Sequence, residues 1–578
     1  MLHFQGGMDM TRFEYNKSDY KKQIQTAAKR DYPDMVLKNA TYLNVFTNEF
    51  LTGDIAITGD KIVGIGSYEG KTEIDCTNKT VVPGFIDGHI HLESTAVRPD
   101  VFAKAALVHG TTSVITDPHE ISNVLGTNGL DYMMAATKGL PLDVFFMLPS
   151  CVPSCSFDES GAVIDSRQIK SYLKDPRVLG LAEMMNAPGV LSCDEETINK
   201  TFATLQAHKI IDGHAPNLTG SDLMAYVASG IYSDHECTTA QEGLEKLRAG
   251  QWIMIREGTA SKNLKALLPL CKEPYASRCM FATDDRHIND ILNEGYIDYI
   301  IRTAISNGVS PATAYKMASH CSATYFGLTN RGAIAPGYLA DLILLSDIES
   351  VTIDSVYKNG RCMTKDVLDA TCKQASLPYL DELVHDTIHI QPITESDLAL
   401  KRIPEQIIGL VPEQLLTTDA GKASRIDVEQ DILKVCVVER HKMTGHIGVC
   451  LIKGYGLKEG AIATSVAHDS HNIIAVGTND YDLSIAIQAL KKMRGGMVVV
   501  NHGRILSAFA LPIAGLMSDF DAEEAKEGLE AIREAAYSLG VNHNIDPFMT
   551  LSFVSLPVIP KMKLTTLGIV NVDKFSLV

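Results

Sequence analysis

The sequence contains no hydrophobic run long enough to cross a membrane. Its longest apolar stretch, Ile505–Met517, includes Pro512 and Gly515, whereas a transmembrane helix needs about 20 consecutive apolar residues. The amino terminus also lacks the basic and then apolar pattern of a secretory signal. We therefore expect a cytoplasmic protein without a membrane partner.

The sequence also has fewer basic than acidic residues, and its cysteines do not occur in the paired spacings of zinc fingers. The chain carries 70 acidic against 52 basic residues, a net charge of −18, and no Lys/Arg-rich run. Because this surplus repels phosphate backbones, we expect no nucleic-acid partner. The 12 cysteines are scattered without zinc-finger spacing, so we interpret them as reduced, buried thiols.

The chain is long enough to build several cores. Its 578 residues, 45% of them hydrophobic and 21% charged, are typical of a globular protein with roughly two to four domains. We interpret residues 1–33 as an extension in which Phe4–Gly6 resemble the remnant of an expression tag. Native sequence is then expected to start near Met8.

Two histidines mark the most informative stretch, GFIDGHIHLE at residues 84–93. His89 and His91 follow an apolar run and a Pro-Gly turn. In an extended strand, side chains at i and i+2 leave the same face about 6–7 Å apart, so both imidazoles can bind one divalent metal ion. Alone, the pair is a weak signal, because two polar residues near a strand end would look the same.

Four more side chains that can bind metals occupy similar positions: Glu183, His214, His235 and Asp284. Each lies at or just beyond a short apolar run that precedes Gly, Pro or a polar turn, where a strand passes into a loop. A single one of these histidines could be a core residue. The set as a whole predicts a metal site.

Strands and helices alternate between residues 81 and 331. Apolar runs predict strands at 84–91, 112–117, 143–149, 178–183, 209–213, 231–234, 252–256 and 279–283. Helix-like segments such as Arg98–His109 and Thr239–Ala249 separate them, which favours a parallel sheet. Eight strands in about 250 residues predict an α/β fold with a (β/α)8 barrel and an active site at the carboxyl ends of its strands. A doubly wound open sheet is the alternative.

Both flanks of this region have their own patterns. Alternating apolar and polar residues predict further strands at 34–45, 53–66, 332–347 and 350–363. Beyond an irregular passage, strand-like runs mix with helical stretches such as Asp521–Leu539, which has acids in its first turn and Gly540 at its end. This last region predicts a separate α/β domain.

The order His-x-His, Glu, His, His, Asp on a barrel resembles the amidohydrolase superfamily. Several sequence motifs are similar to those of bacterial adenine deaminases in particular: GFIDGHIHLES, DPHE, GHAP, SDHE, MIREG and FATDDR. The resemblance runs from about Asp34 to the end of the sequence. It implies a barrel inserted between the two halves of a small β-sandwich. The expected domains are 34–80 with 332–371 (β-sandwich), 81–331 (catalytic barrel), 372–404 (linker) and 405–578 (C-terminal adenine-deaminase-type α/β domain).

The resemblance also implies two divalent metal ions at the barrel mouth. The implied ligands are His89, His91 and Asp284 for the more buried ion, His214 and His235 for the more exposed ion, and Glu183 as a bridge. Imidazole and carboxylate ligands suit manganese or iron(II), which are favoured, and also zinc. A metal-bound hydroxide would attack C6 of adenine and release hypoxanthine and ammonia. Asp284 is expected to be the base that hands the proton to the leaving amine.

Attack at C6 also needs an acid at the neighbouring ring nitrogen. The candidates, each in a loop after a predicted strand, are Glu93, Glu120, Glu236 and Glu257. We favour Glu120 with His119 as catalytic residues, although their DPHE segment could instead cap the next helix. The remaining three stay as candidate substrate contacts, and Arg256 could either bind the substrate or pair with Glu257.

A second group of polar side chains occurs in the C-terminal region: His468, Asp469, His471 and His502. They could reach into the barrel mouth, seal it or bind another metal, or Asp469 could simply form a turn before a strand at 473–476. The apolar character of this region favours a homodimer or a higher homo-oligomer.

Two other functions stay open. A cyclic amidase or N-acyl hydrolase of the same superfamily would need an arginine that binds the substrate carboxylate, and Arg256 is the obvious candidate. A non-catalytic scaffold is the third alternative. Such relatives usually lack metal ligands, and none of the six is missing here.

Overall fold

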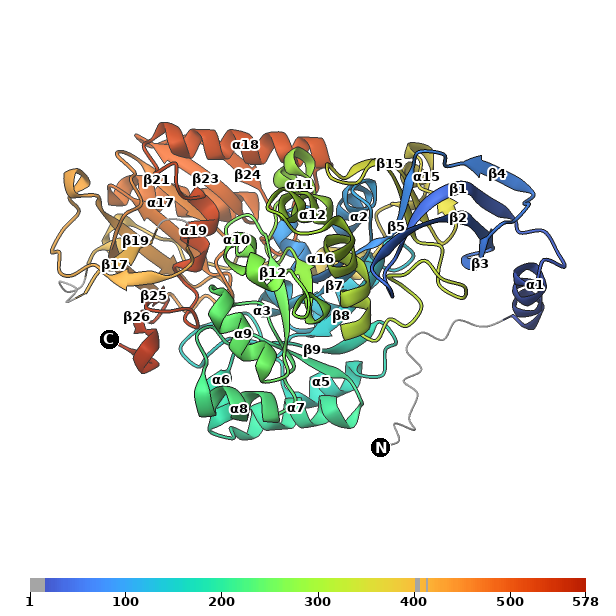
Figure 1. Ribbon diagram of the computed structural model, residues 1–578. Coiled ribbons are helices and arrows are strands. Elements are labelled where there is room, and N and C mark those ends of the chain that lie inside the picture. The colour runs from blue at the N-terminus through green and yellow to red at the C-terminus, as the bar shows by residue number, and fades with distance from the viewer. Residues whose placement is uncertain (1–15, 401–405, 412–413) are drawn as a thin grey trace.

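The computed structural model describes residues 16–400, 406–411 and 414–578; the expected tag remnant and the start near Met8 lie outside these ranges. Three regions follow one another across the molecule (Figure 1). A β-sheet built from both flanks of the barrel region lies at one end, an α/β region lies in the middle, and the C-terminal domain lies at the other end. None of the described helices combines the length and the hydropathy that a membrane span requires.

The end sheet joins strands from two distant parts of the chain. Its strands are β1 (Met35–Asn44), β2 (Glu49–Thr58), β3 (Lys61–Gly66), β4 (Thr72–Asp75), β5 (Thr80–Pro83), β14 (Leu342–Asp347), β15 (Thr352–Lys358) and β16 (Arg361–Cys362). Their order is β16-β15-β14-β5-β1-β2-β3, with β4 paired to β1. The antiparallel pair β5–β14 therefore ties together the two ends of the central region. Helix α1 (Lys17–Ala27) packs against β2 and β3, and α15 (Lys365–Thr371) follows β16 in the chain.

Eight parallel strands form the central region, each close to its predicted place. They are β6 (Phe85–Ile90), β7 (Thr111–Thr116), β8 (Asp143–Leu148), β9 (Val178–Met184), β10 (Ile210–Gly213), β11 (Ser233–Asp234), β12 (Trp252–Arg256) and β13 (Cys279–Ala282). The first five make one sheet and the last three another. Parallel bridges between Ile211 and Ile231, and between Ile90 and Asp284, connect the two sheets at both edges. The strands are almost entirely buried, as expected when helices cover a parallel sheet.

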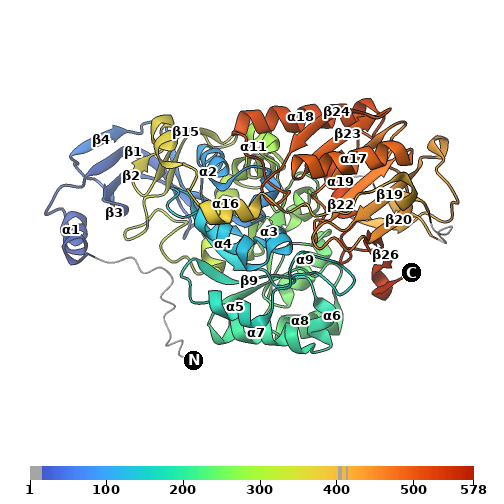
Figure 2. The ribbon, with the colours of Figure 1, turned by 180° about the vertical axis from the view of Figure 1, so that it is seen from behind.

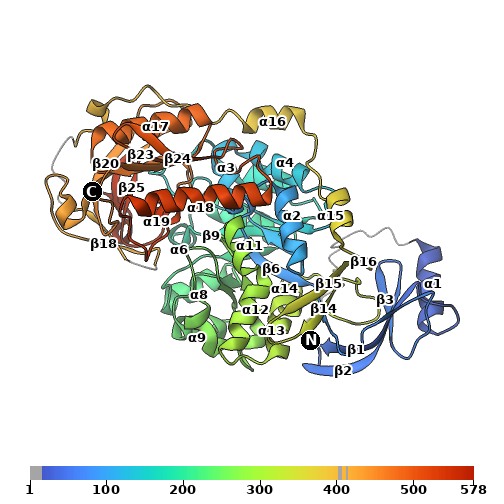
Figure 3. The same ribbon diagram turned by 90° about the horizontal axis from the view of Figure 1, so that it is seen from above.

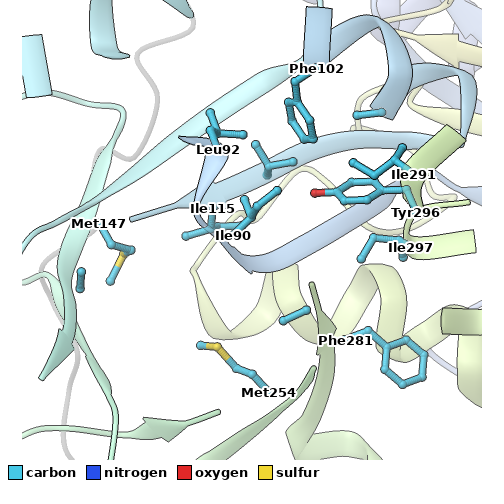
Figure 4. Packing of buried hydrophobic residues seen from close by; sticks show 14 of the residues in the cluster. Ile90, Leu92, Phe102, Ile115, Met147, Met254, Phe281, Ile291, Tyr296 and Ile297 are labelled. Carbon is cyan, nitrogen blue, oxygen red and sulfur yellow. The ribbon is translucent and has the colours of Figure 1, made fainter. Parts of the chain in front are cut away.

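Helices separate these strands, as the alternation of patterns predicts. Those between the strands are α2 (Pro99–Val108), α3 (His119–Leu125), α4 (Thr127–Ala136), α5 (Ser166–Tyr172), α6 (Ala187–Leu191), α7 (Glu195–Gln206), α8 (Gly220–Ala228), α9 (Ala240–Arg248) and α10 (Leu264–Leu267). After β13 follow α11 (Ile288–Glu294), α12 (Ile297–Ser306), α13 (Pro311–Lys316) and α14 (Ser322–Tyr325). The core they enclose includes Ile90, Ile115, Met147 and Met254, which come from four different strands and are fully buried (Figure 4). The predicted alternation of parallel strands and helices, and with it an α/β fold, is confirmed.

The C-terminal domain contains a largely antiparallel sheet. Its strands are β17 (Ile408–Leu410), β18 (Thr417–Asp419), β19 (Ile432–Val438), β20 (Ile447–Lys453), β21 (Ala461–Thr464), β22 (Ile473–Gly477), β23 (Gly496–Asn501) and β24 (Arg504–Ala510), beside a small sheet of β25 (Met562–Thr565), β26 (Gly568–Asn571) and β27 (Ser576–Leu577). The helices of the domain are α17 (Asp480–Met493), α18 (Ala522–Ser538) and α19 (Pro547–Phe553), and α16 (Pro378–Val384) precedes the domain. Asp521 caps α18 in a reciprocal capping box with Glu524, which explains why the helix begins there.

The C-terminal domain packs directly on the central region. Helix α18 lies beside α11 and α2 (Figure 3), and Ser518 N–H donates to the Ala96 carbonyl at 2.9 Å. The segment expected to be a linker contains α16, which packs against α4 of the central region (Figure 2). The domain thus covers one end of the strands on which the predicted ligands lie.

Candidate active site

All six predicted metal ligands meet at one end of the parallel strands. They come from the carboxyl ends of β6, β9, β10, β11 and β13, or directly after them, and are His89, His91, Glu183, His214, His235 and Asp284. The side chains of all six are buried. His89 Nε2 and His91 Nε2 lie 3.2 Å apart, and the rings of His89 and His235 stack with centroids separated by 4.4 Å.

Glu183 lies at the centre of this cluster. Its Oε2 is 2.7 Å from His214 Nδ1 and 3.0 Å from His235 Nε2. Its Oε1 faces the other pair, at 3.4 Å from His91 Nε2 and 3.9 Å from His89 Nε2. The two carboxylate oxygens therefore point to different pairs of histidines, the arrangement that a bridging ligand requires.

The cluster fits metal ions better than it fits a purely hydrogen-bonded network. Among the described residues, the buried His214 Nε2 and His235 Nδ1 have no hydrogen-bond partner. His91 Nδ1 lies 2.9 Å from the Asp117 carbonyl, which directs its Nε2 into the cluster in the way that outer contacts orient metal-binding histidines. Several triplets of these donors lie close enough to share one ion, and imidazole with carboxylate suits divalent transition metals.

Asp284 is held in place by charge and by an unusual backbone. Its φ of 61° lies in the left-handed region, which few residues other than glycine adopt and which often marks functional sites. Oδ1 lies 3.3 Å from His91 Nε2, and Oδ2 accepts from Arg256 Nη1 at 2.5 Å. Burial disfavours the charged carboxylate, but Arg256 and His91 outweigh burial and hold the pKa of Asp284 well below its usual range.

Arg256 pairs with Glu236 rather than with Glu257. Its Nη2 donates to Glu236 Oε2 at 2.8 Å, and its Nη1 donates to Glu236 Oε1 at 2.5 Å. Glu236 turns back toward the cluster, with Oε1 3.6 Å from both His214 Nδ1 and His235 Nε2. The guanidinium is therefore already neutralised by two carboxylates, those of Glu236 and Asp284.

The other two candidate substrate contacts lie elsewhere. Glu257 accepts a hydrogen bond from the Leu264 N–H, and Glu93 accepts one from the Ile121 N–H. Neither is among the described residues that line the pocket over the cluster. Glu93 lines a second pocket with Glu120 and His471, and its buried Oε2 has no hydrogen-bond partner among the described residues.

His119 and Glu120 form the first turn of α3 instead of a free loop. The cap position of this helix is Pro118, which makes no side-chain capping bond. His119 Nδ1 is 2.8 Å from Asp117 Oδ2 and 3.4 Å from Glu183 Oε1. This places the pair beside the cluster, with Glu120 Oε1 3.3 Å from His119 Nε2.

The C-terminal domain reaches into the same place. His468 Nδ1 lies 2.8 Å from Glu120 Oε1, and His471 Nε2 contacts the other carboxylate oxygen of Glu120. Burial disfavours charge on Glu120, but His468 and His471 outweigh burial and hold its pKa well below the usual range. His502, in contrast, is 81% exposed and pairs with Glu459.

One pocket unites the two domains. On the side of the central region it is lined by five of the six cluster residues, all except His89, together with His119, Glu120, Glu236 and Arg256. Its C-terminal side contains His468 and Asp469 and four apolar residues: Leu415, Phe553, Leu556 and Ile559. The sequence analysis missed these four, because apolar residues in a folded domain give no signal that separates a pocket wall from a core.

Asp87 is a second residue that sequence reasoning missed. It lies two positions before His89 and accepts from Thr283 Oγ1 and from the Tyr296 hydroxyl, both at 2.5 Å. Burial raises its pKa to about 6. Its contacts tie β6 to the segment that carries Asp284. The sequence signal that could have indicated Asp87 is its position as the acidic residue of the GFIDGH motif.

The comparisons with known proteins agree with this site. Residues 80–363 match the amidohydrolase family and residues 412–576 match the adenine deaminase C-terminal domain. The fold and the site thus define a metal-dependent hydrolase of the amidohydrolase class.

The chain is 45% identical to adenine deaminase 2 of Carboxydothermus hydrogenoformans, over 96% of this chain and 99% of that protein. It is 44% identical to adenine deaminase of Oceanobacillus iheyensis, over 96% of this chain and 97% of that protein. The chain belongs to the adenine deaminase family.

Proposed function

We propose that this protein is an adenine deaminase, which converts adenine and water into hypoxanthine and ammonia. Relatives of that name align with almost the whole chain. The observation that carries the proposal is the shared pocket, in which three histidines and two carboxylates of the buried cluster face a wall supplied by the C-terminal domain. Both matched families therefore contribute to one site.

The residues present fit two divalent metal ions. His89, His91 and Asp284 would hold one ion, His214 and His235 the other, and Glu183 would lie between them, an assignment supported by the two directions of its oxygens. Manganese or iron(II) is the favoured metal, with zinc as a further candidate. When bound, such ions lower the pKa of a water molecule so that it can act as a nucleophile at neutral pH.

The proposed proton transfers use side chains at the edge of the cluster. Asp284 accepts the proton of the attacking water at Oδ1, while Arg256 holds Oδ2 and fixes the orientation of the carboxylate. The same carboxyl group then donates the proton to the leaving amine. His119 and Glu120 line the same pocket beside the cluster, and we assign to this pair the hydrogen bond or proton that the ring nitrogen beside C6 requires.

Adenine is favoured over the carboxylate-bearing substrates of a cyclic amidase or an N-acyl hydrolase. Those substrates need an arginine that is free to bind a carboxylate. Among the described residues, Arg256 is the arginine that lines the pocket, and Glu236 and Asp284 already neutralise it. The contact pattern of Arg256 therefore supports the deaminase.

The finer architecture belongs to this proposal as well. We propose that β6–β13 close into a (β/α)8 barrel at 81–331, since bridges join the two parallel sheets at both edges. The flanks at 34–80 and 332–371 would form the β-sandwich, 372–404 the linker and 405–578 the C-terminal domain. Cytoplasmic location and a homo-oligomeric state stay predictions.

Ammonia release tests the proposed function directly. Metal-replete protein is incubated with adenine, adenosine and a panel of cyclic amides, and ammonia is measured over time. We expect turnover of adenine and little of the others. Faster turnover of adenosine than of adenine, or turnover of cyclic amides alone, would overturn the assignment.

A further inference from the structure

We propose that the C-terminal domain is the base-binding half of the active site. In this inference, which rests on the proposed function, an apolar wall formed by Leu415, Phe553, Leu556 and Ile559 contacts the faces of the substrate ring, and His468 offers it a hydrogen bond. The barrel would then bind the metal ions and transfer the protons. The C-terminal domain, which covers the barrel, would recognise the planar heteroaromatic base.

The distribution of side chains around the pocket motivates this division. On the barrel side the lining is ionisable apart from Met185, whereas the C-terminal side supplies four apolar residues. Ligand pockets usually need an apolar surface for the body of the ligand and a few polar groups that orient it. The flat faces of a purine find such a surface mainly on the C-terminal side.

The apolar wall is buried but lies at the edge of its own domain. Phe553, at the end of α19, and Leu556 and Ile559, after it, belong to a small hydrophobic cluster with Met549 and are 3–6% exposed. This cluster is separate from the main core of the domain. Three of its members, Phe553, Leu556 and Ile559, line the pocket, which indicates a lining role.

His468 presents one nitrogen to the pocket. Glu120 contacts its Nδ1 at 2.8 Å, and Phe553 stacks on its ring with centroids 4.4 Å apart and planes 3° apart. These two contacts fix the plane of the imidazole. Its Nε2 is buried, lies 4.0 Å from Asp285 Oδ2 and has no hydrogen-bond partner among the described residues, so it can still form a hydrogen bond to a ring nitrogen or an exocyclic group of the base.

Lys563 is a positioning residue for this wall. Its side chain is fully buried, and Nζ donates to the Leu415 carbonyl at 2.9 Å and to the Phe553 carbonyl at 2.8 Å. One Lys563 nitrogen thus joins two wall residues that lie far apart in the sequence. The contacts are to backbone oxygens, so they set where the wall lies.

The test compares two phenylalanines of one helix. Phe553 lines the pocket, whereas Phe548, five positions earlier and 2% exposed, does not line it. We expect Phe553→Leu to raise KM for adenine about fivefold to tenfold, because an aromatic contact to a base is lost. Phe548→Leu should leave KM unchanged, and both variants should keep the metal content of the wild type.

A binding measurement gives a second readout. Hypoxanthine is titrated calorimetrically into metal-replete wild type and both variants, and the Kd of Phe553→Leu should rise by the same factor as KM. Equal KM and Kd values for the two variants would overturn the proposal. Should Phe553→Leu not fold, Leu556→Ala is compared in the same way with Leu551→Ala, which is buried in α19 away from the pocket.

The failures of the two proposals are distinguishable. Wild type that releases no ammonia from adenine refutes the proposed function, whatever the variants do. Wild type that deaminates adenine while Phe553→Leu behaves like Phe548→Leu refutes only the role of the C-terminal wall.

Discussion

The two halves of the pocket differ in almost every property. The barrel half consists of histidines, carboxylates and Arg256 at the ends of parallel strands, whereas the C-terminal half is mainly apolar and comes from loops and a helix end. The strands hold the barrel half at short distances, such as 2.7 Å between His214 and Glu183. The C-terminal half is held by packing and by backbone carbonyls that accept from Lys563.

This difference indicates how the work of the site is divided. Metal ligands need positions defined to fractions of an ångström, which side chains on a rigid parallel sheet provide. An apolar wall tolerates looser geometry, because hydrophobic contact is not directional. Variants of the barrel half should therefore change kcat or metal content, and variants of the C-terminal half should change KM.

The largest effect is expected from Asp284→Asn. The amide cannot take the proton of the attacking water, so kcat for adenine should fall about 10²–10⁴-fold. Metal analysis should still find the wild-type content, because an amide oxygen can replace the carboxylate as a ligand. Asp222→Asn, exposed on α8, serves as the control. Full activity of Asp284→Asn would remove Asp284 as the base.

A smaller loss is expected from Glu183→Gln. Both carboxylate oxygens face histidine pairs, and the amide nitrogen of glutamine cannot bind a cation. We expect metal content to fall from two ions to about one per chain, and kcat/KM to fall about 10–100-fold, as in sites with a perturbed ligand shell. An unchanged metal count would refute the bridging role.

The sequence predicts the barrel half well, for a physical reason. Each ligand follows an apolar run that must be buried in a parallel sheet, so residues such as His214 and Asp284 carry their own structural context. The helix start at His119 was harder, because DPHE reads as a loop and the first turn of α3 begins without a side-chain cap.

The C-terminal half could not be predicted in the same way. Glu120 and His471 are 351 positions apart, and nothing local to either residue indicates the partner. His468 and His471 precede a strand, which is compatible with a simple turn. Phe553 and Leu556 have the composition of core residues, and only their place at the domain boundary makes them a wall.

His468 gives the sharpest test of the C-terminal half. His468→Asn keeps an amide N–H near the position of Nδ1, where it can still donate to Glu120, but removes the nitrogen that faces the pocket. Loss of one hydrogen bond should raise KM for adenine about 3–10-fold with little change in kcat. His468→Gln, which places its amide near Nε2, should lie closer to wild type.

Two results would contradict this assignment. A fall in kcat with unchanged KM would place His468 in the chemical step. Equal behaviour of His468→Asn and of His446→Gln, a variant of a histidine with a 52% exposed side chain, would remove His468 from substrate recognition.

The smallest effect is expected from Lys563→Met, and it concerns stability. Burial lowers the pKa of Lys563 to about 7, whereas a lysine in the unfolded chain titrates at about 10.4. Between these values the unfolded chain binds more protons than the folded one, so stability rises with pH, and this contribution disappears as the pH falls through 7. Lys563→Met should therefore reduce the rise of Tm between pH 7 and 10, while Lys561→Met, half exposed nearby, should not. An unchanged pH dependence in Lys563→Met would mean that Lys563 stays charged, and the carbonyls of Leu415 and Phe553 would then be held by an ammonium ion throughout this range.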